Sequence, residues 1–354
     1  MKRIMINELN NYINEKVQIQ GWVHRIRKLK SITFIILRDR TGLVQCVVDN
    51  EEINSSEIKL ESVVSIIGTV KESKNNLNPF EISVEKFNII NSSLEELPIE
   101  INKENLEVNL DTMLNNRMLS LRHEKVNSIF KIQNIIVEGF REFLNKEDFT
   151  EISTPKLVEE IMNLEENLLK FILNKVTDKG EIYLKLLNAE VPSIGEKIPR
   201  IKLSEAIDIL KTKYNKTGLE GDIDPEGEKL ICKYAKEKFG CDFIFLTHYP
   251  RKKRPMYTMP CNTMETHSFD LLFRGIEITT GGQRIHDYNM LIENIKYKGL
   301  NPDNYESYTS NFKYGMPPHG GLAIGLERIT AKILGFENVR EASLIPRDRM
   351  RLIP

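Results

Sequence analysis

The sequence predicts an N-terminal all-β barrel followed by an α+β domain that is built on a largely antiparallel sheet. Five short apolar runs fill the first 100 residues and are separated by turn-like segments. From residue 123 onward, strand-like and helix-like segments mix without regular strand–helix alternation, which disfavours a parallel sheet. A chain of 354 residues is long enough for two such domains.

Composition excludes several classes of protein. Apolar residues make up 40% of the chain and the net charge is −1, so neither a disordered nor a fibrous protein is indicated. No apolar run reaches the roughly 18–20 residues of a membrane span, and polar residues interrupt the N-terminus too early for a signal peptide. The four cysteines form no CxxC pair, which predicts reduced thiols. We therefore expect a cytoplasmic protein with no membrane contact.

The N-terminal domain, residues 1–100, has the layout of an OB-fold. A helix-like segment, residues 51–61, follows the third of the five apolar runs, and this order is typical of that small barrel. The predicted strands cover Val17–Val23, Ile32–Leu37, Leu43–Val48, Val63–Val70 and Phe80–Ile90.

Positive charge is concentrated on the first three of these strands. Residues 21–45 hold six basic side chains and one acidic one, and Trp22 and Phe34 lie among them. Bases stack on aromatic rings while Lys and Arg neutralise phosphates, so this mixture favours single-stranded nucleic acid. A solvated basic edge that protects the sheet from aggregation is the alternative that the pattern leaves open.

The second domain, residues 123–354, follows a predicted linker at residues 101–122. Its first helix, residues 123–145, has a wide apolar face that fits either a core or a subunit interface. A strand at residues 149–155 and a helix at residues 159–175 come next. Further helices are predicted at 204–210 (capped by Ser204), 225–236, 287–298, 302–312 and 326–334, and further strands at 243–246, 271–280 and 321–325.

Polar residues that suit chemistry occur late in the chain. On a predicted strand that ends in two glycines, Glu277 shares a face with Thr279, and Thr280 lies on the other face. A carboxylate beside a hydroxyl suits Mg²⁺, and Arg284 suits a carboxylate ligand. Arg328 begins a helix after a glycine-flanked strand, where it can reach a phosphate. A salt-bridged strand end and a surface arginine are the alternatives. No P-loop or dinucleotide-binding glycine motif is present.

These segments resemble the class II aminoacyl-tRNA synthetases, specifically the archaeal-type aspartyl branch of the aspartyl/asparaginyl group. The segment GWVHRIRKLK…FIILRDRTGLVQ is similar to the anticodon-binding OB-fold of that group. The segment FREFLNKEDFTEISTP is similar to motif 1, which builds the dimer interface in the family. FDLLFRGIEITTGGQRIH and GMPPHGGLAIGLERI are similar to the aspartyl active-site strands and to motif 3.

The resemblance implies roles for individual residues. Glu277 and Thr280 would hold a Mg²⁺ that bridges ATP phosphates, and Thr280 would also touch the amino acid. Arg284 would recognise the aspartate side chain, because a guanidinium fork prefers a carboxylate over an amide. Glu277 and Arg328 would be catalytic. Gly325, Leu326, Glu327 and Arg328 would line the ATP site, and His24, Arg25, Phe34 and Gln45 would contact the anticodon of tRNA.

The implied reaction is ATP-dependent formation of aspartyl-adenylate, followed by transfer of aspartate to tRNA-Asp, and also to tRNA-Asn if anticodon reading is relaxed. The chain departs from the family after Val158, where it enters a helix directly. No FRxE arginine of motif 2 occurs between Val158 and Ile201. We therefore expect Arg284, Glu277 and Arg328 to form one polar cluster that binds ATP–Mg²⁺ weakly and makes adenylate very slowly.

Three functions remain open from the sequence. The chain is an aspartate–tRNA ligase, a catalytically inactive paralogue that binds tRNA, or an adenylating or amidotransfer enzyme derived from a synthetase. The OB-fold disfavours the third, because such derived enzymes lack it. A C2 homodimer is expected, through the wide apolar face of the helix over Val126–Leu144.

Overall fold

The computed structural model describes residues 3–49, 58–75, 77–93, 96–147, 158–314, 316 and 318–349. The chain divides into two compact units, residues 1–123 and residues 124–354. No helix in the described ranges is both long enough and apolar enough to cross a membrane.

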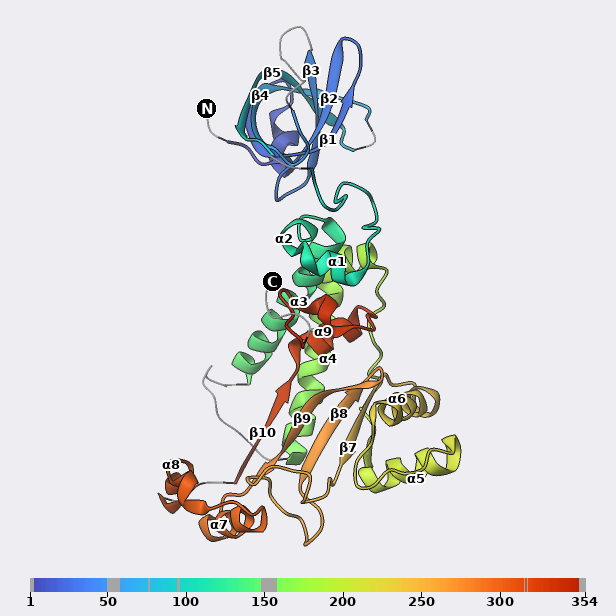
Figure 1. The fold of residues 1–354 in the computed structure, drawn as a ribbon, viewed down its shortest axis with the longest axis vertical. Helices are drawn as coiled ribbons and strands as arrows, with labels where there is room; N and C mark the ends of the chain where they lie inside the picture. Colours follow the sequence, from blue (N-terminus) through green and yellow to red (C-terminus); the bar gives the residue numbers. More distant parts are fainter. Residues whose placement is uncertain are drawn as a thin grey trace. The chain divides into compact units, whose positions relative to one another are not determined.

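The first unit is a closed five-stranded barrel, as predicted (Figure 1). Its strands follow the order β1-β2-β3-β5-β4, and β3 and β5 pair in parallel while the other neighbours are antiparallel. Buried and partly exposed residues alternate along β2 and β3, so one set of side chains fills the barrel and the other faces outward. The bounds are β1 Lys16–Lys28, β2 Ile32–Arg38, β3 Leu43–Asp49, β4 Val63–Glu72 and β5 Phe80–Asn91.

Two short helices lie in the segment that the sequence analysis treats as a linker. They are α1, Leu110–Asn115, and α2, Arg117–Ser120. The side chain of Asn109 caps α1 by accepting a 2.8 Å hydrogen bond from the Thr112 backbone N–H. The predicted boundaries at residues 100 and 122 stay predictions, and most of the helix-like segment at 51–61 lies outside the described residues.

The second unit is built on a five-stranded sheet with the order β10-β9-β8-β7-β6. Its neighbours are antiparallel except for the pair β6 and β7, which confirms the predicted α+β architecture. The strands are β6 Arg200–Lys202, β7 Phe243–Thr247, β8 Ser268–Phe273, β9 Ile276–Arg284 and β10 His319–Ile324.

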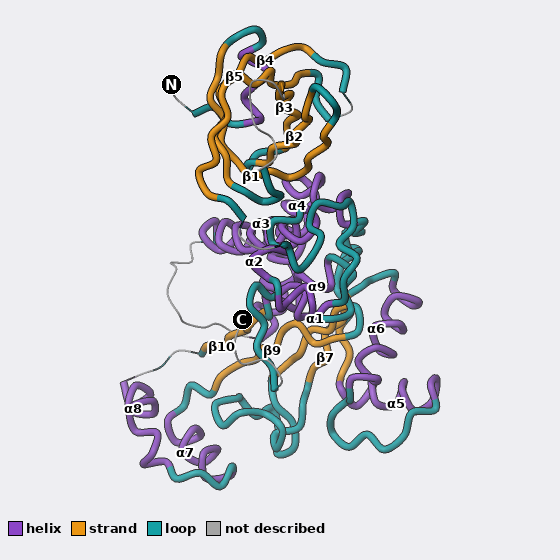
Figure 2. The backbone as a smooth tube through the Cα atoms, turned by 45° about the horizontal axis from the view of Figure 1, so that its top comes forward, coloured by secondary structure: helices purple, strands orange, loops and turns teal. Residues whose placement is uncertain are grey.

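Both faces of this sheet carry helices (Figure 2). Phe243 and Phe245 of β7 pack in one apolar cluster with α3, α4 and α9. Ile244 and Leu246, which alternate with them, pack in a second cluster with α5 and α6. The helices are α3 Glu124–Lys146, α4 Val158–Leu187, α5 Leu203–Tyr214, α6 Pro225–Phe239, α7 Tyr288–Tyr297, α8 Glu306–Thr309 and α9 Leu326–Ile333.

Several predicted elements differ from those observed. The helix predicted at 159–175 continues to Leu187, because its apolar face packs along α3 and the sheet over its whole length. The residue that precedes α5 in the cap position is Lys202, and no side chain caps this helix, so the prediction of Ser204 as the cap is wrong. The helix predicted at 302–312 is broken into three short turns. The strand predicted at 149–155 lies outside the described residues.

Candidate functional site

The polar residues 274–284 belong to a hairpin and not to one strand. Arg274 and Gly275 form the turn between β8 and β9, and both have positive φ angles, 44° and 89°. The prediction of a single strand at 271–280 is therefore wrong. Gly281 and Gly282 lie inside β9, paired with β8 and β10, and not at the strand's end. A Cβ atom on Gly281 would lie 2.2 Å from the ring of Phe269, so this position has no room for a side chain.

A β-bulge decides which side chains of β9 meet. Leu271 of β8 pairs with Thr279, but the next residue, Leu272, pairs with Glu277, so Ile278 is an extra residue on β9. Thr279 and Ile278 are consequently both buried. The Thr280 hydroxyl donates a 2.7 Å hydrogen bond to Oε1 of Glu277. The expected pairing of Glu277 with Thr279 on one face is wrong, because it assumed an unbroken two-residue alternation.

Helix α9 brings Arg328 to the same place. The Arg328 guanidinium donates a 2.7 Å hydrogen bond to the backbone carbonyl of Glu277, and its Nη1 lies 3.9 Å from the Glu277 carboxylate. The backbone N–H of Gly325 donates to the carbonyl of the bulged Ile278, which ties the start of α9 to β9. Of the other predicted ATP-site residues, Leu326 packs into the core and Glu327 is exposed.

A carboxylate from α6 completes this cluster and was missed from the sequence. Oε2 of Glu228 accepts a 3.2 Å hydrogen bond from the Glu277 backbone N–H. Burial raises the pKa of Glu228, and that hydrogen bond and the nearby Arg328 offset the rise only in part. Nothing in the local sequence marks Glu228, because acidic residues are common in the first turns of helices.

Two paired glycines separate this cluster from Arg284. Gly282 of β9 pairs with Gly321 of β10, and both lie between the Thr280 row and the Arg284 row of the sheet. Arg284 is the last residue of β9, four residues from Thr280, which is about 13 Å along a strand. The structure therefore brings Glu277, Thr280 and Arg328 together but not Arg284. The expectation of one cluster is wrong, and a ligand that touches both ends must be extended.

Arg284 has two tyrosine neighbours. Its guanidinium lies 5.0 Å from the centroid of the Tyr257 ring, and Tyr308 lies beside it. Within the described ranges Arg284 makes no ion pair. Its cationic fork is thus free to accept a carboxylate in bidentate geometry.

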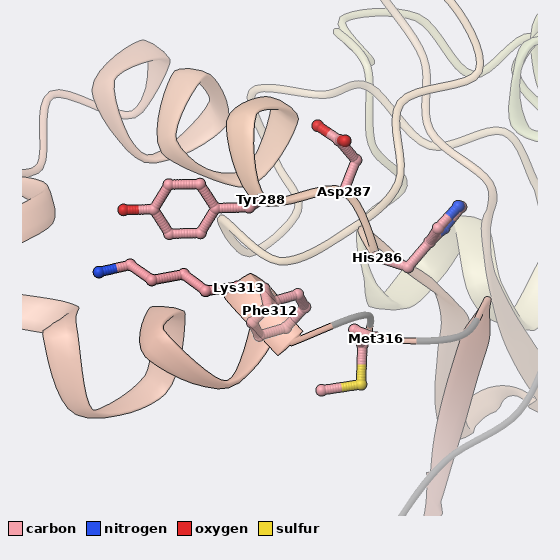
Figure 3. A pocket seen from close by; sticks show the side chains of 6 residues that line it. All are labelled: His286, Asp287, Tyr288, Phe312, Lys313 and Met316. Atoms are coloured by element: carbon pink, nitrogen blue, oxygen red, sulfur yellow. The ribbon is translucent and has the colours of Figure 1, made fainter.

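A cavity of about 520 Å³ lies near the end of β9 in the sequence, with its first lining residue, His286, two residues after the strand ends (Figure 3). It lies among the residues that follow β9 and those that precede β10. The ammonium group of Lys313 lies 5.4 Å from the Tyr288 ring on its wall. The lining residues are His286, Asp287, Tyr288, Phe312, Lys313 and Met316, none of which the sequence analysis singled out.

Asp270 of β8 is a second functional candidate that the sequence analysis missed. It pairs directly with Thr280 across the strands, and it forms a 2.7 Å ion pair with Arg254. Its other oxygen, Oδ1, is buried and has no hydrogen-bond partner among the described residues. The sequence does contain a signal for Asp270, because it is the one charged residue in the apolar run of β8. A carboxylate in a buried strand needs a partner or a ligand, so this position could have been singled out.

On the barrel, the predicted nucleic-acid residues share one outer face. Arg25, Ile36 and Gln45 form one row across β1, β2 and β3, and Arg27, Phe34 and Val47 form the next row. Phe34 and Gln45 are half-buried. The Gln45 amide donates a 2.7 Å hydrogen bond to Glu81, and Arg25 donates to the backbone carbonyl of Asn102.

Part of the basic cluster has a structural role. Arg38 pairs at 2.7 Å with Glu61, a carboxylate whose side chain is 2% exposed, and its guanidinium lies over the Trp22 ring. Burial, and then Arg38 and Arg25, lower the pKa of His24 to about 4, so His24 is neutral at pH 7 and accepts from Arg38 at 3.2 Å. The positive charge left for a ligand is therefore smaller than the sequence indicates.

Comparison with known proteins relates both units to described families. Residues 17–90 match the OB-fold nucleic acid binding domain. Residues 109–160 and 158–349 match the tRNA synthetases of class II (D, K and N), in two stretches that meet at residues 158–160.

Individual relatives agree with this assignment. The chain is 37% identical over 435 aligned positions to an aspartate–tRNA(Asp/Asn) ligase of Deinococcus radiodurans, with 100% of this chain and 99% of the relative covered. It is 34% identical to an aspartate–tRNA(Asp) ligase of Pyrococcus furiosus, with 98% of each chain covered. The solved aspartyl tRNA synthetase of Entamoeba histolytica matches with a TM-score of 0.87 and 27% identity, over 100% of this chain and 93% of that one.

The first of these alignments also contains a gap. It spans 435 positions, whereas this chain has 354 residues, so at least 81 aligned positions have no residue here. The interruption of the family match at residues 158–160 is where the sequence analysis finds motif 2 to be missing. With its barrel, its antiparallel sheet and these relatives, the chain belongs to the class II tRNA synthetases.

Proposed function

We propose that this protein is an aspartate–tRNA ligase with low activity. The substrate is indicated by Arg284, whose guanidinium makes no ion pair with any described residue. It lies at the end of β9, beyond the paired glycines Gly282 and Gly321, in a chain similar over its whole length to aspartate–tRNA ligases. Arg284 would bind the side-chain carboxylate of aspartate, and the amino acid would extend along β9 toward Thr280. A neutral asparagine amide would bind this site less well, because it lacks the charge that pairs with the fork.

The opposite end of β9 suits the phosphates of ATP. Arg328 would bind a terminal phosphate, and its hydrogen bond to Glu277 fixes its position before the nucleotide arrives. Glu277, Thr280 and Asp270 offer oxygen ligands that suit Mg²⁺. Oδ1 of Asp270 is buried with no hydrogen-bond partner among the described residues, which is consistent with such a ligand. When bound, Mg²⁺ neutralises phosphate charge.

A metal held there needs phosphate oxygens as well. No group of three His, Cys, Asp or Glu side chains in the described part of the chain is arranged to hold an ion alone. ATP and Mg²⁺ would therefore bind together, which is the usual way in which Mg²⁺ enters nucleotide sites.

The barrel would bind the anticodon of tRNA through the face that carries Phe34. A base would stack on the Phe34 ring, Arg25 and Arg27 would neutralise the backbone, and Gln45 would exchange its bond to Glu81 for a base edge. The neutral His24 stands beside this face and favours no particular base by charge. Both tRNA-Asp and tRNA-Asn are substrates to test.

Pyrophosphate exchange with ATP and aspartate tests the proposal. We expect exchange to be slower by about 10²–10³ than in a complete synthetase, because the loss of one preorganised charge donor costs about that much. The chain has no FRxE arginine to meet charge on the α-phosphate. Exchange with asparagine and not with aspartate would contradict the proposal.

The second candidate is a catalytically inactive synthetase homologue that binds tRNA. The interruption at residues 158–160 favours it, because at least 81 aligned positions are lost beside an otherwise retained fold. No exchange above background, together with tRNA binding, would establish this alternative. The third candidate, an adenylating enzyme without tRNA, is disfavoured by the retained barrel. The cytoplasm stays the predicted compartment.

A further inference from the structure

A second cavity, of about 250 Å³, lies behind the turn of the β8–β9 hairpin. Four cationic side chains and a single carboxylate line it, so the lining has an excess of three positive charges. The cations are Lys229, Lys233, Lys236 and Arg274, and the carboxylate is Asp242. Neither the sequence analysis nor the proposed catalytic cluster uses these residues.

The three lysines converge because of their spacing on α6. Positions 229, 233 and 236 lie on one face of a helix, one above the other. Gly275 lets this face approach the hairpin, since a Cβ atom there would lie 3.0 Å from Cγ of Lys229. Arg274 completes the group from a left-handed backbone conformation, held by its hydrogen bonds to the carbonyls of Lys332 and Glu190.

The single carboxylate of the cavity already has hydrogen-bond and ion-pair partners. Asp242 accepts a 2.7 Å hydrogen bond from the Ser193 N–H, lies 3.1 Å from the Lys236 ammonium and 3.8 Å from Arg274. Among the described residues, the one carboxylate paired with Lys233 is that of Glu237, at 3.9 Å, and Glu237 is closer, at 2.8 Å, to Lys213. The excess charge therefore has no internal counterion of matching strength in the described part of the cavity.

The pKa of the neighbouring Lys332 is lowered by the same positive charges. Burial lowers its pKa, and the positive charges of Lys229 and Arg274 lower it further, against an opposing effect of Glu337. Burial also raises the pKa of Cys232, on the cavity wall, to about 12, so that thiol stays protonated and is no nucleophile. The chemistry left to the cavity is the binding of an anion.

We propose that this cavity binds a phosphate group. Lysine ammonium groups and an arginine fork are the side chains that bind phosphate. A phosphate with about −1.5 to −2 charge at pH 7 would balance half or more of the excess, and a backbone phosphate with one charge would balance about a third. None of the described residues that line the cavity is aromatic, so the wall has no platform for a base. A water takes about 30 Å³ in the liquid, so there is room for a phosphate and part of its hydration shell.

Two sources supply this chemistry, namely a backbone phosphate of bound tRNA and free phosphate or pyrophosphate. The inference goes beyond the proposed function and does not depend on it, because a catalytically inactive chain would bind phosphate equally well. Pyrophosphate exchange, measured in parallel, reports on the proposed function alone.

The test uses a double variant of the full chain, Lys229→Ala with Lys233→Ala, both at exposed positions. The control is Lys197→Ala with Lys211→Ala, two exposed lysines outside the cavity that remove the same charge. Each protein is titrated with inorganic phosphate and pyrophosphate by calorimetry, and with a tRNA transcript at several KCl concentrations.

If tRNA backbone is the source, the cavity variant binds tRNA about tenfold more weakly than the control, and its salt slope falls by about 1–2. If free phosphate is the source, the cavity variant loses phosphate or pyrophosphate binding while tRNA binding equals that of the control. Cavity and control variants that behave alike in both titrations would overturn the proposal, as would a wild-type chain that binds neither ligand.

Discussion

Arg328 donates a 2.7 Å hydrogen bond to the backbone carbonyl of Glu277, so the first turn of α9 is fixed to β9 at the position of the bulge. The guanidinium keeps four further N–H donors for a ligand. Its side chain is 51% exposed, which leaves those donors accessible. The helix and the strand thus hold a cation in place before any phosphate arrives.

Replacing Arg328 by alanine should weaken ATP binding by about 10–100-fold, because a hydrogen bond to a charged group contributes about 1.5–3 kcal/mol. Calorimetry with ATP–Mg²⁺ measures this. Lys211→Ala is the control, since Lys211 is an exposed cation on α5 that belongs to no predicted site. Equal ATP affinity in Arg328→Ala and wild type would remove Arg328 from the nucleotide site.

Arg284→Gln should raise the KM for aspartate in pyrophosphate exchange by at least about tenfold while the KM for ATP stays within about twofold. The reason is that Arg284 and the ATP cluster lie at opposite ends of β9. Arg284→Lys keeps the charge but loses the fork, so it should recover only part of the affinity. A change in the KM for ATP alone would show that Arg284 belongs to the ATP site and not to the aspartate site.

Stability should depend on pH through Glu165 of α4. Its side chain is fully buried, and burial raises its pKa to about 8, against an opposing effect of the nearby Thr279 hydroxyl. The folded chain then keeps a proton that the unfolded chain loses. The free energy of unfolding should therefore fall by about 1.4 kcal/mol per pH unit between about pH 4.5 and 8, and level off above.

Glu165→Gln should abolish this slope and be more stable than wild type at pH 8, by urea unfolding at each pH. The exposed Glu160 of the same helix supplies the control, Glu160→Gln, which should keep the wild-type slope. A Glu165→Gln protein that follows the wild-type pH curve would mean that this carboxyl does not hold the proton.

Phe34→Ala should weaken binding of an anticodon stem-loop by about 1–3 kcal/mol for each base that stacks on the ring. Fluorescence anisotropy at moderate salt measures the affinity. Phe34→Trp keeps a stacking surface and should bind within about threefold of wild type. The stacking role would be excluded by an alanine variant that binds as tightly as the tryptophan variant.

The chain should form a homodimer at micromolar concentration. Most apolar residues of α3 pack on α4 and the sheet, so its surplus apolar surface is smaller than the sequence suggests, but Phe140 remains 36% exposed. Phe140→Glu should shift the sedimentation coefficient toward the monomer. Phe239→Glu, on α6, is the control, with a ring that is 44% exposed. A wild-type monomer would refute the prediction.

The barrel and the antiparallel sheet were predictable because short apolar runs separated by turn-like segments mark their strands. Residues 32–37 and 43–48 are such runs, and the bounds of β2 and β3 follow from them within one residue. The length of α4 was not predictable, because its second half is helical through contacts with α3 that lie far apart in sequence. Local pattern shows that an element exists better than it shows where it ends.

The sequence indicated several residues of the site but not which of them lie side by side. Glu277, Thr280 and Arg328 come together as the resemblance implies, but the alternation rule alone pairs Glu277 with Thr279. Asp270 was missed because its neighbour Thr280 comes from pairing between strands, which is invisible in one sequence. Glu228 was missed for the same reason, since α6 reaches β9 only in the folded chain.

The extra residue at Ile278 makes the site depend on the number of residues in β9. Glu277 and Thr280 share a face because the bulge takes up Ile278, which leaves Thr279 alone between them in the alternation. One residue inserted between Thr279 and Thr280 would turn the Thr280 hydroxyl to the opposite face, toward the apolar layer formed by α3 and α4. All the residues of the site would still be present, but the Glu277–Thr280 hydrogen bond would be lost. At this position a shift in spacing would therefore be more damaging than most substitutions.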